Sequence, residues 1–154
     1  MGFSKRYFKP NLGDPTPLSA LATRRIRFEE VDMLGIAWHG NYVSFLDDGR
    51  IAFADRYGLS YMSMKDDGVA APIVQMHLDY ISPLYFDNVL EIEAILHWSD
   101  SLRLNFEYKL TCEGRQVARG YTIQLFVDLK GNLVVLPPSL VKKFRHKWEN
   151  GDFK

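Results

Sequence analysis

The stretch VDMLGIAWHGNY, residues 31–42, places a carboxylate and an imidazole among apolar residues. Asp32 and His39 stand beside side chains of the kind that form a protein core, and an isolated charge in apolar surroundings is costly. Such groups acquire a partner or a shifted pKa, and both features are common at reaction sites. Asp32 and His39 are therefore the candidate catalytic residues, although a carboxylate that only closes a turn would have the same spacing.

The residues around this pair could complete a site for acyl transfer. Asn41 is a reasonable N-cap for a following helix, and a helix N-terminus presents unpaired N–H groups with a partial positive charge. Such donors, aimed at a carbonyl oxygen, stabilise the oxyanion of acyl transfer, while Asp32 could attack the carbonyl or activate a water. Gly40 would allow a close approach to the backbone. Gly40, Asn41 and Tyr42 are accordingly the candidate substrate-binding residues.

Other residues whose side chains could bind a metal or react have structural interpretations. His77 and Asp79 share one strand face and could form a pair, but two metal ligands without a third give a weak signal. Cys112 continues an apolar series and is expected to be a small packing residue. The sequence has no Gly-rich phosphate loop, no Cys/His cluster with zinc spacing and no G-x-S-x-G motif. No cofactor and no metal ion is therefore expected.

Residues 41–57 are predicted to form the one long helix. Apolar side chains or glycine recur there at three- and four-residue spacing, at Tyr42, Phe45, Leu46, Gly49, Phe53 and Tyr57. Asp47, Asp48 and Asp55 fall on another face, which predicts a solvated surface, with Asp48 a candidate contact between subunits. Gly58 is a reasonable helix stop.

Beyond Gly68 the hydrophobic period changes from helical to alternating, which predicts half-buried strands of an antiparallel sheet. The alternating segments are residues 74–80, 90–98 and 102–110. A hairpin turn at 113–115 leads into a last strand at about 116–128, and a further strand is expected at about 20–29. A short C-terminal helix is expected to begin at 137–139. This combination predicts an α+β fold.

The bulk properties fit one globular domain, at residues 19–150, after an irregular arm at residues 1–18. The chain has 19 Lys and Arg residues and 19 Asp and Glu residues, so its formal net charge is zero. A chain without an excess of positive charge has no overall electrostatic attraction for nucleic acid. The N-terminus does not have the pattern of a signal peptide, and no segment approaches the length of a membrane span. The single cysteine suits a reducing compartment. We therefore expect a cytoplasmic protein that neither enters a membrane nor binds nucleic acid.

Residues 25–53, RIRFEEVDMLGIAWHGNYVSFLDDGRIAF, resemble the opening of the hotdog-fold acyl-CoA thioesterases of the 4-hydroxybenzoyl-CoA thioesterase type. That family has a strand, an acidic pair around D-x-x-G, a short apolar run, and N-Y leading into a long helix. The residues that match this pattern are Glu30, Asp32, Gly35, Asn41 and Tyr42. The later matching segments are 71–74, 83–92 and 136–137. The likeness covers most of residues 24–145 and leaves the arm unmatched.

This resemblance implies a hotdog fold, in which an antiparallel β-sheet wraps around one long α-helix, and a homodimer or homotetramer. It implies hydrolysis of an acyl-CoA thioester to free acid and thiol. The family's catalytic carboxylate maps to Asp32, as nucleophile or general base, and its oxyanion donor to a backbone N–H near His39 and Gly40. Bacterial thioesterases associated with the Tol-Pal cell-envelope system carry a histidine at the position of His39. The alternatives are an acyl-carrier-protein thioesterase and a non-catalytic acyl-CoA-binding module.

The sequence also departs from this family. Some members have a basic run after the residue equivalent to Trp98, which contacts the phosphates of coenzyme A, but here residues 99–101 are Ser-Asp-Ser. Four other cations could supply that contact, namely Arg103, Arg115, Arg119 and Lys142. Five apolar residues could line an acyl site or belong to the core, namely Met33, Leu34, Trp38, Met62 and Met64. Phe28 stands where some relatives have a tyrosine.

Overall fold

The computed structural model describes residues 7–153, so the first six residues of the arm lie outside the described part. The strands are β1 (Leu18–Arg25), β2 (Val69–Ala70), β3 (Ile73–Tyr80), β4 (Val89–His97), β5 (Arg103–Cys112), β6 (Arg115–Leu125) and β7 (Val127–Asp128). The helices are α1 (Tyr42–Tyr57), α2 (Tyr61–Asp66) and α3 (Ser139–Glu149), with short 3₁₀ turns at Phe28–Glu30 and His39–Asn41.

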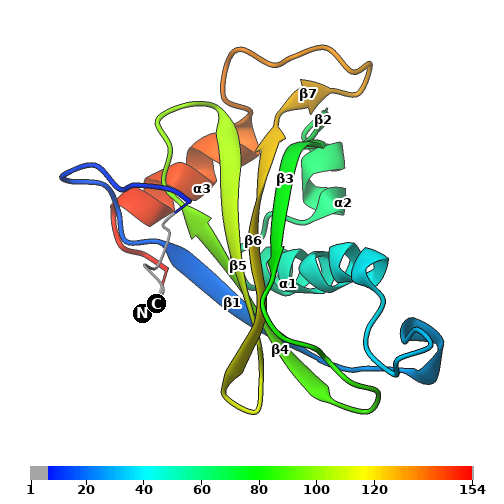
Figure 1. The fold of residues 1–154 in the computed structure, drawn as a ribbon. Helices are drawn as coiled ribbons and strands as arrows, with labels where there is room; N and C mark the ends of the chain where they lie inside the picture. The colour runs from blue at the N-terminus through cyan, green and yellow to red at the C-terminus, as the bar shows by residue number, and fades with distance from the viewer. Residues whose placement is uncertain (1–6, 154) are drawn as a thin grey trace.

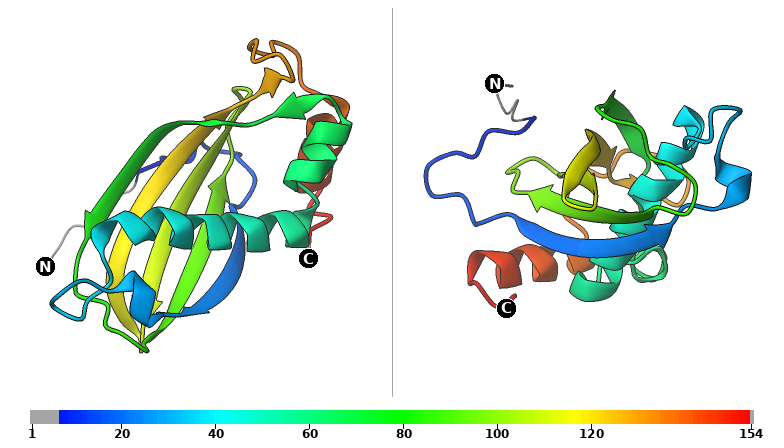
Figure 2. Two further views of the ribbon diagram at one scale, coloured as in Figure 1. Left: turned by 90° about the vertical axis from the view of Figure 1, so that its right-hand side faces the viewer. Right: turned by 60° about the horizontal axis from the view of Figure 1, so that its bottom comes forward.

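Five strands form one antiparallel sheet in the order β1-β4-β5-β6-β3, and β2 pairs separately with β7. Helix α1 lies across one face of the large sheet (Figures 1 and 2). The predicted α+β architecture is therefore confirmed. Because β1 and β3 are the two edges, each leaves one side of its backbone without a strand partner among residues 7–153.

Helix α1 forms where the sequence predicted the long helix, and it packs closely on the sheet. Gly49 makes this approach feasible, because a Cβ there would lie 2.9 Å from Ile92 Cγ2 and 3.3 Å from Ala94 Cβ. The helix ends at Gly58, whose φ of 81° is left-handed and whose N–H donates to the Ala54 carbonyl at 2.8 Å. Helix α1 therefore ends at the stop that the sequence predicted.

The expected polar face of α1 lies at the surface, where Asp47 binds Arg50 and Asp48 binds Arg24. Two other expectations about the elements need correction. The first strand ends at Arg25 instead of about residue 29, because its partner β4 begins at Val89, opposite Arg25. On β3, three of the four apolar residues expected to share a half-buried face are exposed, because β3 is an edge strand; these are Val74, Met76 and Tyr80.

The arm and the C-terminal helix contact the ends and the outer side of the sheet. The Tyr7 hydroxyl donates to Asp79 Oδ2 at 2.7 Å, and its ring lies 5.0 Å from that of Tyr121. Burial and the hydrogen bond to Asp79 raise the pKa of Tyr7. Trp148 on α3 donates from Nε1 to the Thr16 carbonyl at 2.8 Å. The described part of the arm is therefore attached to the domain, which its irregular sequence did not indicate.

Two structural interpretations are confirmed. Cys112 is buried, and burial raises the pKa of its thiol. His77 Nε2 lies 3.0 Å from Asp79 Oδ1, so these residues form the expected pair. Among residues 7–153, no group of three or more His, Cys, Asp or Glu is placed to hold a metal ion. No helix in this described range is long and apolar enough to cross a membrane.

Candidate active site

Asp32 lies on a tight turn between the two 3₁₀ turns that precede α1. Its N–H donates to the Ile36 carbonyl at 2.9 Å, and the Gly35 N–H donates to its carbonyl at 3.0 Å. Gly35 has a φ of 71°, a conformation that favours glycine. Asp32 Oδ1 accepts the Leu34 N–H at 2.8 Å, whereas Oδ2 has no hydrogen-bond donor among the described residues. One carboxylate oxygen thus fixes the turn, and the other is left without a donor in the described part of the chain.

The turn is exposed, which corrects the expectation that apolar neighbours bury Asp32. Met33 is 99% exposed and Leu34 is 77% exposed, while Asp32 and His39 are also at the surface. The apolar residues lie on a turn that extends beyond the N-terminal end of α1 (Figure 2), and no layer formed by the described residues covers them. Of the apolar residues considered for an acyl site, Met64 alone is buried.

Glu30 holds this turn to the start of α1. Its carboxylate accepts hydrogen bonds from Arg24 and from the Arg27 N–H, and its carbonyl accepts the Trp38 N–H at 2.9 Å and Asn41 Nδ2 at 2.7 Å. Burial alone would raise the pKa of Glu30, but the hydrogen bonds from Arg24 and the Arg27 N–H outweigh burial and hold this pKa below its usual value. Asn41 therefore attaches the turn through its side chain instead of capping the helix.

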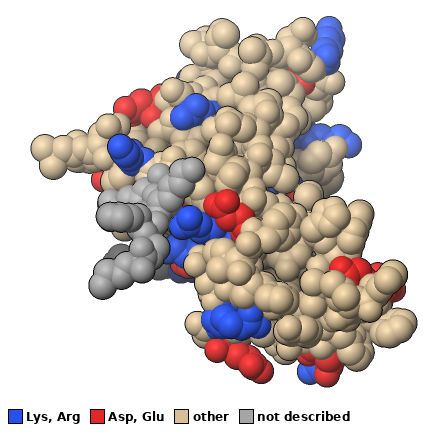
Figure 3. Space-filling view, in the orientation of Figure 1, with Lys and Arg blue, Asp and Glu red and all other residues tan. Residues whose placement is uncertain are grey.

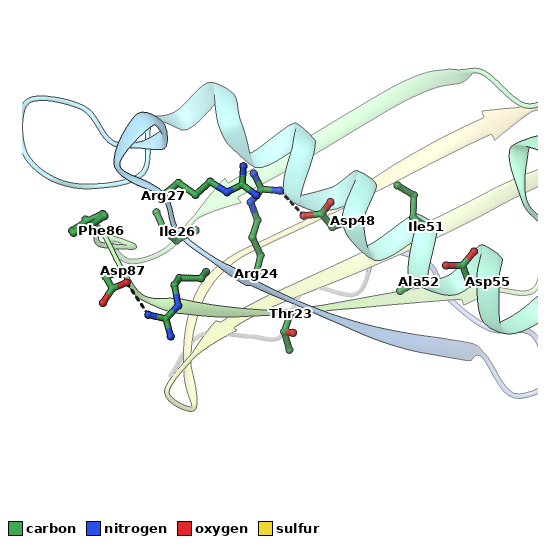
Figure 4. Close-up of a pocket in the computed structure, with 11 residues that line it drawn as sticks. Thr23, Arg24, Ile26, Arg27, Asp48, Ile51, Ala52, Asp55, Phe86 and Asp87 are labelled. Atoms are coloured by element: carbon green, nitrogen blue, oxygen red, sulfur yellow. Dashed lines mark hydrogen bonds and ion pairs between the residues drawn. The ribbon is translucent and has the colours of Figure 1, made fainter.

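Arg24 links the same assembly to the helix, because its Nη1 lies 2.8 Å from Asp48 Oδ2 (Figure 4). Arg24 also lines a cleft of about 620 Å³ on the β1 side of α1, together with Arg25 and other residues. Arg25 is paired there with Asp87 at 3.0 Å. The cations of this cleft are largely neutralised, so it has no excess positive charge for an anion.

The 3₁₀ turn at His39–Asn41 supplies free backbone donors where α1 begins. The N–H groups of His39 and Gly40 form no backbone hydrogen bond in the described part of the chain, whereas the Asn41 N–H donates to Trp38. A Cβ on Gly40 would lie 2.2 Å from the Trp38 ring, so the indole lies directly against the glycine. The two N–H groups are therefore the candidate donors for an oxyanion at the helix start.

Two contacts around this turn join residues far apart in the sequence. The Tyr80 hydroxyl donates to the His39 carbonyl at 2.8 Å, which fixes the turn to the end of β3. Tyr42 is buried, with its ring 4.9 Å from that of Tyr80. Tyr80 was considered only as part of an apolar strand face, and no local pattern indicates a contact across 41 positions. Glu30, by contrast, belongs to the acidic pair that the sequence had indicated.

Two of the four cations considered for coenzyme A phosphates, Arg115 and Arg119, have local partners. Arg115 donates to the Pro83 carbonyl at 3.0 Å and to Ser82. Arg119 lies 3.5 Å from Asp79. On the face drawn in Figure 3, Lys and Arg stand in separate places, interspersed with Asp and Glu. This face therefore carries no broad basic surface.

Known proteins resemble this chain in sequence and in structure. The family model described as the thioesterase-like superfamily matches residues 26–144. The acyl-CoA thioester hydrolase YbgC of Escherichia coli O157:H7 is 25% identical over 123 residues, which cover 79% of this chain and 92% of that protein. A solved structure from Thermus thermophilus has a TM-score of 0.75 and 26% identity, covering 84% of this chain and 97% of its own.

A 4-hydroxybenzoyl-CoA thioesterase variant, solved with 4-hydroxybenzoyl-CoA, has a TM-score of 0.71 at 21% identity. This likeness covers 80% of the present chain and 96% of the other, and it shows the shared fold. The family model spans well over half of the sequence, from the end of β1 into α3. The chain therefore belongs to the thioesterase-like superfamily and has the hotdog fold.

Proposed function

We propose that Asp32 and the backbone N–H groups of His39 and Gly40 together hydrolyse an acyl-CoA thioester to a free acid and a thiol. Family membership assigns thioester hydrolysis, and the roles of the residues are the proposal. The observation that carries it is the free Asp32 oxygen on a turn that Glu30 connects to unpaired donors at the start of α1. A carboxylate and a pair of oxyanion donors, the groups that acyl transfer needs, thus lie on one connected segment.

The reaction needs little assistance to the leaving group. In this mechanism the N–H groups of His39 and Gly40 hold the thioester oxygen, while Asp32 attacks the carbonyl carbon or removes a proton from an attacking water. A thiol has a pKa of about 8.5, so a thiolate departs readily near neutral pH. A separate acid and a Ser-His-Asp triad are therefore unnecessary, which agrees with a site built on one carboxylate.

The assembly proposed for this protein is a homodimer or homotetramer with the active site near the subunit interface. Edge strand β3 exposes Val74 and Met76, and α1 exposes Val43. Exposed edges and apolar surface are commonly covered by a second copy. Such a copy would also cover part of the exposed turn around Asp32. A cytoplasmic location is part of the proposal and is supported by the single cysteine.

Replacing Asp32 by asparagine tests the proposed role directly. Asp32→Asn keeps the size of the side chain but removes the nucleophile and the base, so turnover should fall by at least about a hundredfold, or about 2.7 kcal/mol of barrier. Release of free thiol from a panel of aliphatic, aromatic and hydroxylated acyl-CoA thioesters measures it. Asp66→Asn, on the exposed surface of α2, is the matched control and should retain full activity. A folded Asp32→Asn protein with near wild-type turnover would contradict the proposal.

A further inference from the structure

Tyr80, the last residue of β3, contacts the first residue of the 3₁₀ turn that carries the candidate oxyanion donors and the residue that follows this turn. Its hydroxyl donates to the His39 carbonyl at 2.8 Å, and its ring lies 4.9 Å from the ring of Tyr42. Tyr42 is only 3% exposed, and the Tyr80 backbone pairs with Ala118 of β6. Burial raises the pKa of Tyr80 above its usual value of about 10, so the hydroxyl remains a donor at neutral pH. One side chain thus attaches the turn to the sheet.

The carbonyl that Tyr80 holds belongs to the same peptide unit as one of the candidate donors. The carbonyl of His39 and the N–H of Gly40 are the two polar ends of one planar trans unit, and they point in opposite directions. Because the unit is rigid, a hydrogen bond to its carbonyl fixes the direction of its N–H. The Tyr42 N–H donates to the same carbonyl, and hydrogen bonds at one end of a peptide unit polarise it and strengthen the donor at the other end.

The two candidate donors are held in different ways. The peptide unit that presents the His39 N–H is fixed within the turn, because the Trp38 carbonyl accepts the Asn41 N–H at 3.0 Å. The unit that presents the Gly40 N–H ends at a glycine, which leaves the adjacent peptide units freer to rotate than another residue would. A donor at this position therefore benefits from a restraint outside the turn, and the Tyr80 hydroxyl supplies one.

Tyr57 makes the same kind of contact at the other end of α1. Its hydroxyl donates to the Ser19 carbonyl at 2.9 Å. Helix α1 rises about 22 Å between Tyr42 and Tyr57, so this contact is remote from the candidate donors. The two tyrosines therefore allow a hydrogen bond that orients the donors to be compared with one that only stabilises the fold.

We propose that Tyr80 is a positioning residue, which sets the direction of the Gly40 N–H so that it binds the same thioester oxygen as the His39 N–H. This inference rests on the proposed function. A donor that is oriented in advance stabilises the oxyanion of the transition state more than the ground-state carbonyl, so Tyr80 should affect kcat more than KM. Without the hydroxyl the donor is still present but less well oriented. The loss should therefore be smaller than the factor of about a hundred or more that removal of a whole donor costs.

The kinetic test compares the two tyrosines. Tyr80→Phe keeps the ring against Tyr42 and removes the hydroxyl, so kcat should fall by about five- to tenfold while KM stays within about twofold of the wild-type value. Tyr57→Phe loses a hydrogen bond of the same kind and should keep the wild-type kcat. Thiol release from the acyl-CoA panel measures both parameters, and thermal denaturation shows that each variant is folded. Tyr80→Leu serves if the phenylalanine variant does not fold.

The carbonyl stretch of a bound thioester measures the orientation of the donors without turnover. Hexanoyl-CoA and benzoyl-CoA, each labelled with carbon-13 at the carbonyl, are bound to the Asp32→Asn protein, in which hydrolysis should be slow, and the infrared band is recorded. Adding Tyr80→Phe should move this band to higher frequency, because the carbonyl then accepts weaker hydrogen bonds. Adding Tyr57→Phe should leave the band in place.

Failure of this inference and failure of the proposed function give different results. A Tyr80→Phe protein with the wild-type kcat, a loss of kcat that Tyr57→Phe shares, an effect on KM alone or an unmoved carbonyl band overturns this inference and leaves the proposed function in place. If the wild-type protein hydrolyses no member of the panel, the proposed function fails. A carbonyl band that Tyr80→Phe still moves would then support the orientation of the donors by Tyr80.

Discussion

Asp32 and His39 contribute to the proposed reaction through different groups. Asp32 acts through its carboxylate, whose Oδ1 already holds the turn and whose Oδ2 is free. His39 contributes its backbone N–H, while its carbonyl is held by Tyr80 and its ring stands at the surface beside Trp38. The importance of the two side chains should therefore be unequal.

Removing the imidazole should cost much less than removing the carboxylate. His39→Ala keeps the backbone N–H, so its turnover should stay within about tenfold of the wild-type value. The pH profile of kcat should also keep its shape, because in this mechanism the imidazole neither gives nor takes a proton. Thiol release over a pH series measures both effects. A loss as large as that of Asp32→Asn, with a changed profile, would show that the ring takes part in catalysis.

At the scale of elements, the turn that carries Asp32 is held by polar contacts instead of a core. Glu30 joins β1, through Arg24, to the start of α1, through Asn41. Arg24 in turn reaches Asp48 in the second turn of α1. A carboxylate that is buried and bound by several donors supports both the stability of the fold and the position of Asp32.

Glu30→Gln should therefore lower both stability and turnover. Glutamine loses the charge that Arg24 binds, so the free energy of unfolding should fall by about 1–3 kcal/mol. Because the pKa of Glu30 is lower in the folded protein than its unfolded value of about 4.3, this stabilisation is present above that pH and is lost as the pH falls through the folded value. Denaturation at several pH values should show that the free energy of unfolding of the variant falls less steeply as the pH is lowered. Glu29→Gln, which is exposed, should match the wild-type protein.

At the scale of the whole molecule, the exposed apolar edge predicts self-association. Light scattering at micromolar concentration should give a mass well above the 17.8 kDa of one chain. Val74→Glu on β3 places a charge on the proposed interface and should shift the protein toward monomers with reduced turnover. Val135→Glu, on an exposed loop outside the sheet, should leave the mass unchanged. A wild-type protein that stays monomeric would count against the assembly.

The arm offers a second prediction at this scale. Deleting residues 1–10 removes the contact of Tyr7 with Asp79 and should lower the unfolding temperature by about a few degrees, while turnover stays nearly intact. Tyr7→Phe keeps the ring against Tyr121 and should account for part of this decrease. Thermal denaturation and thiol release measure the two effects. A loss of turnover without a loss of stability would place the arm at the active site.

The local sequence was sufficient for the long helix and the long strands, and it indicated the candidate carboxylate. Helix α1 and its stop at Gly58 follow from a period of 3.6, and the long strands follow from a period of 2, because each period assigns side chains to one face. The spacing of Asp32, Gly35 and Asn41 located the candidate site. These features depend on residues close together in the chain, so a single sequence contains them.

Only the tertiary structure decided what those residues meet. The contacts of Tyr80 with His39 and of Gln124 with Ala71 join positions 41 and 53 residues apart. Such contacts depend on strand register and on the packing of α1, which no short pattern specifies. The same packing leaves Asp32 exposed, since its apolar neighbours lie on a turn that none of residues 7–153 covers. The sequence determined which groups are present, and the register of the sheet determined their partners.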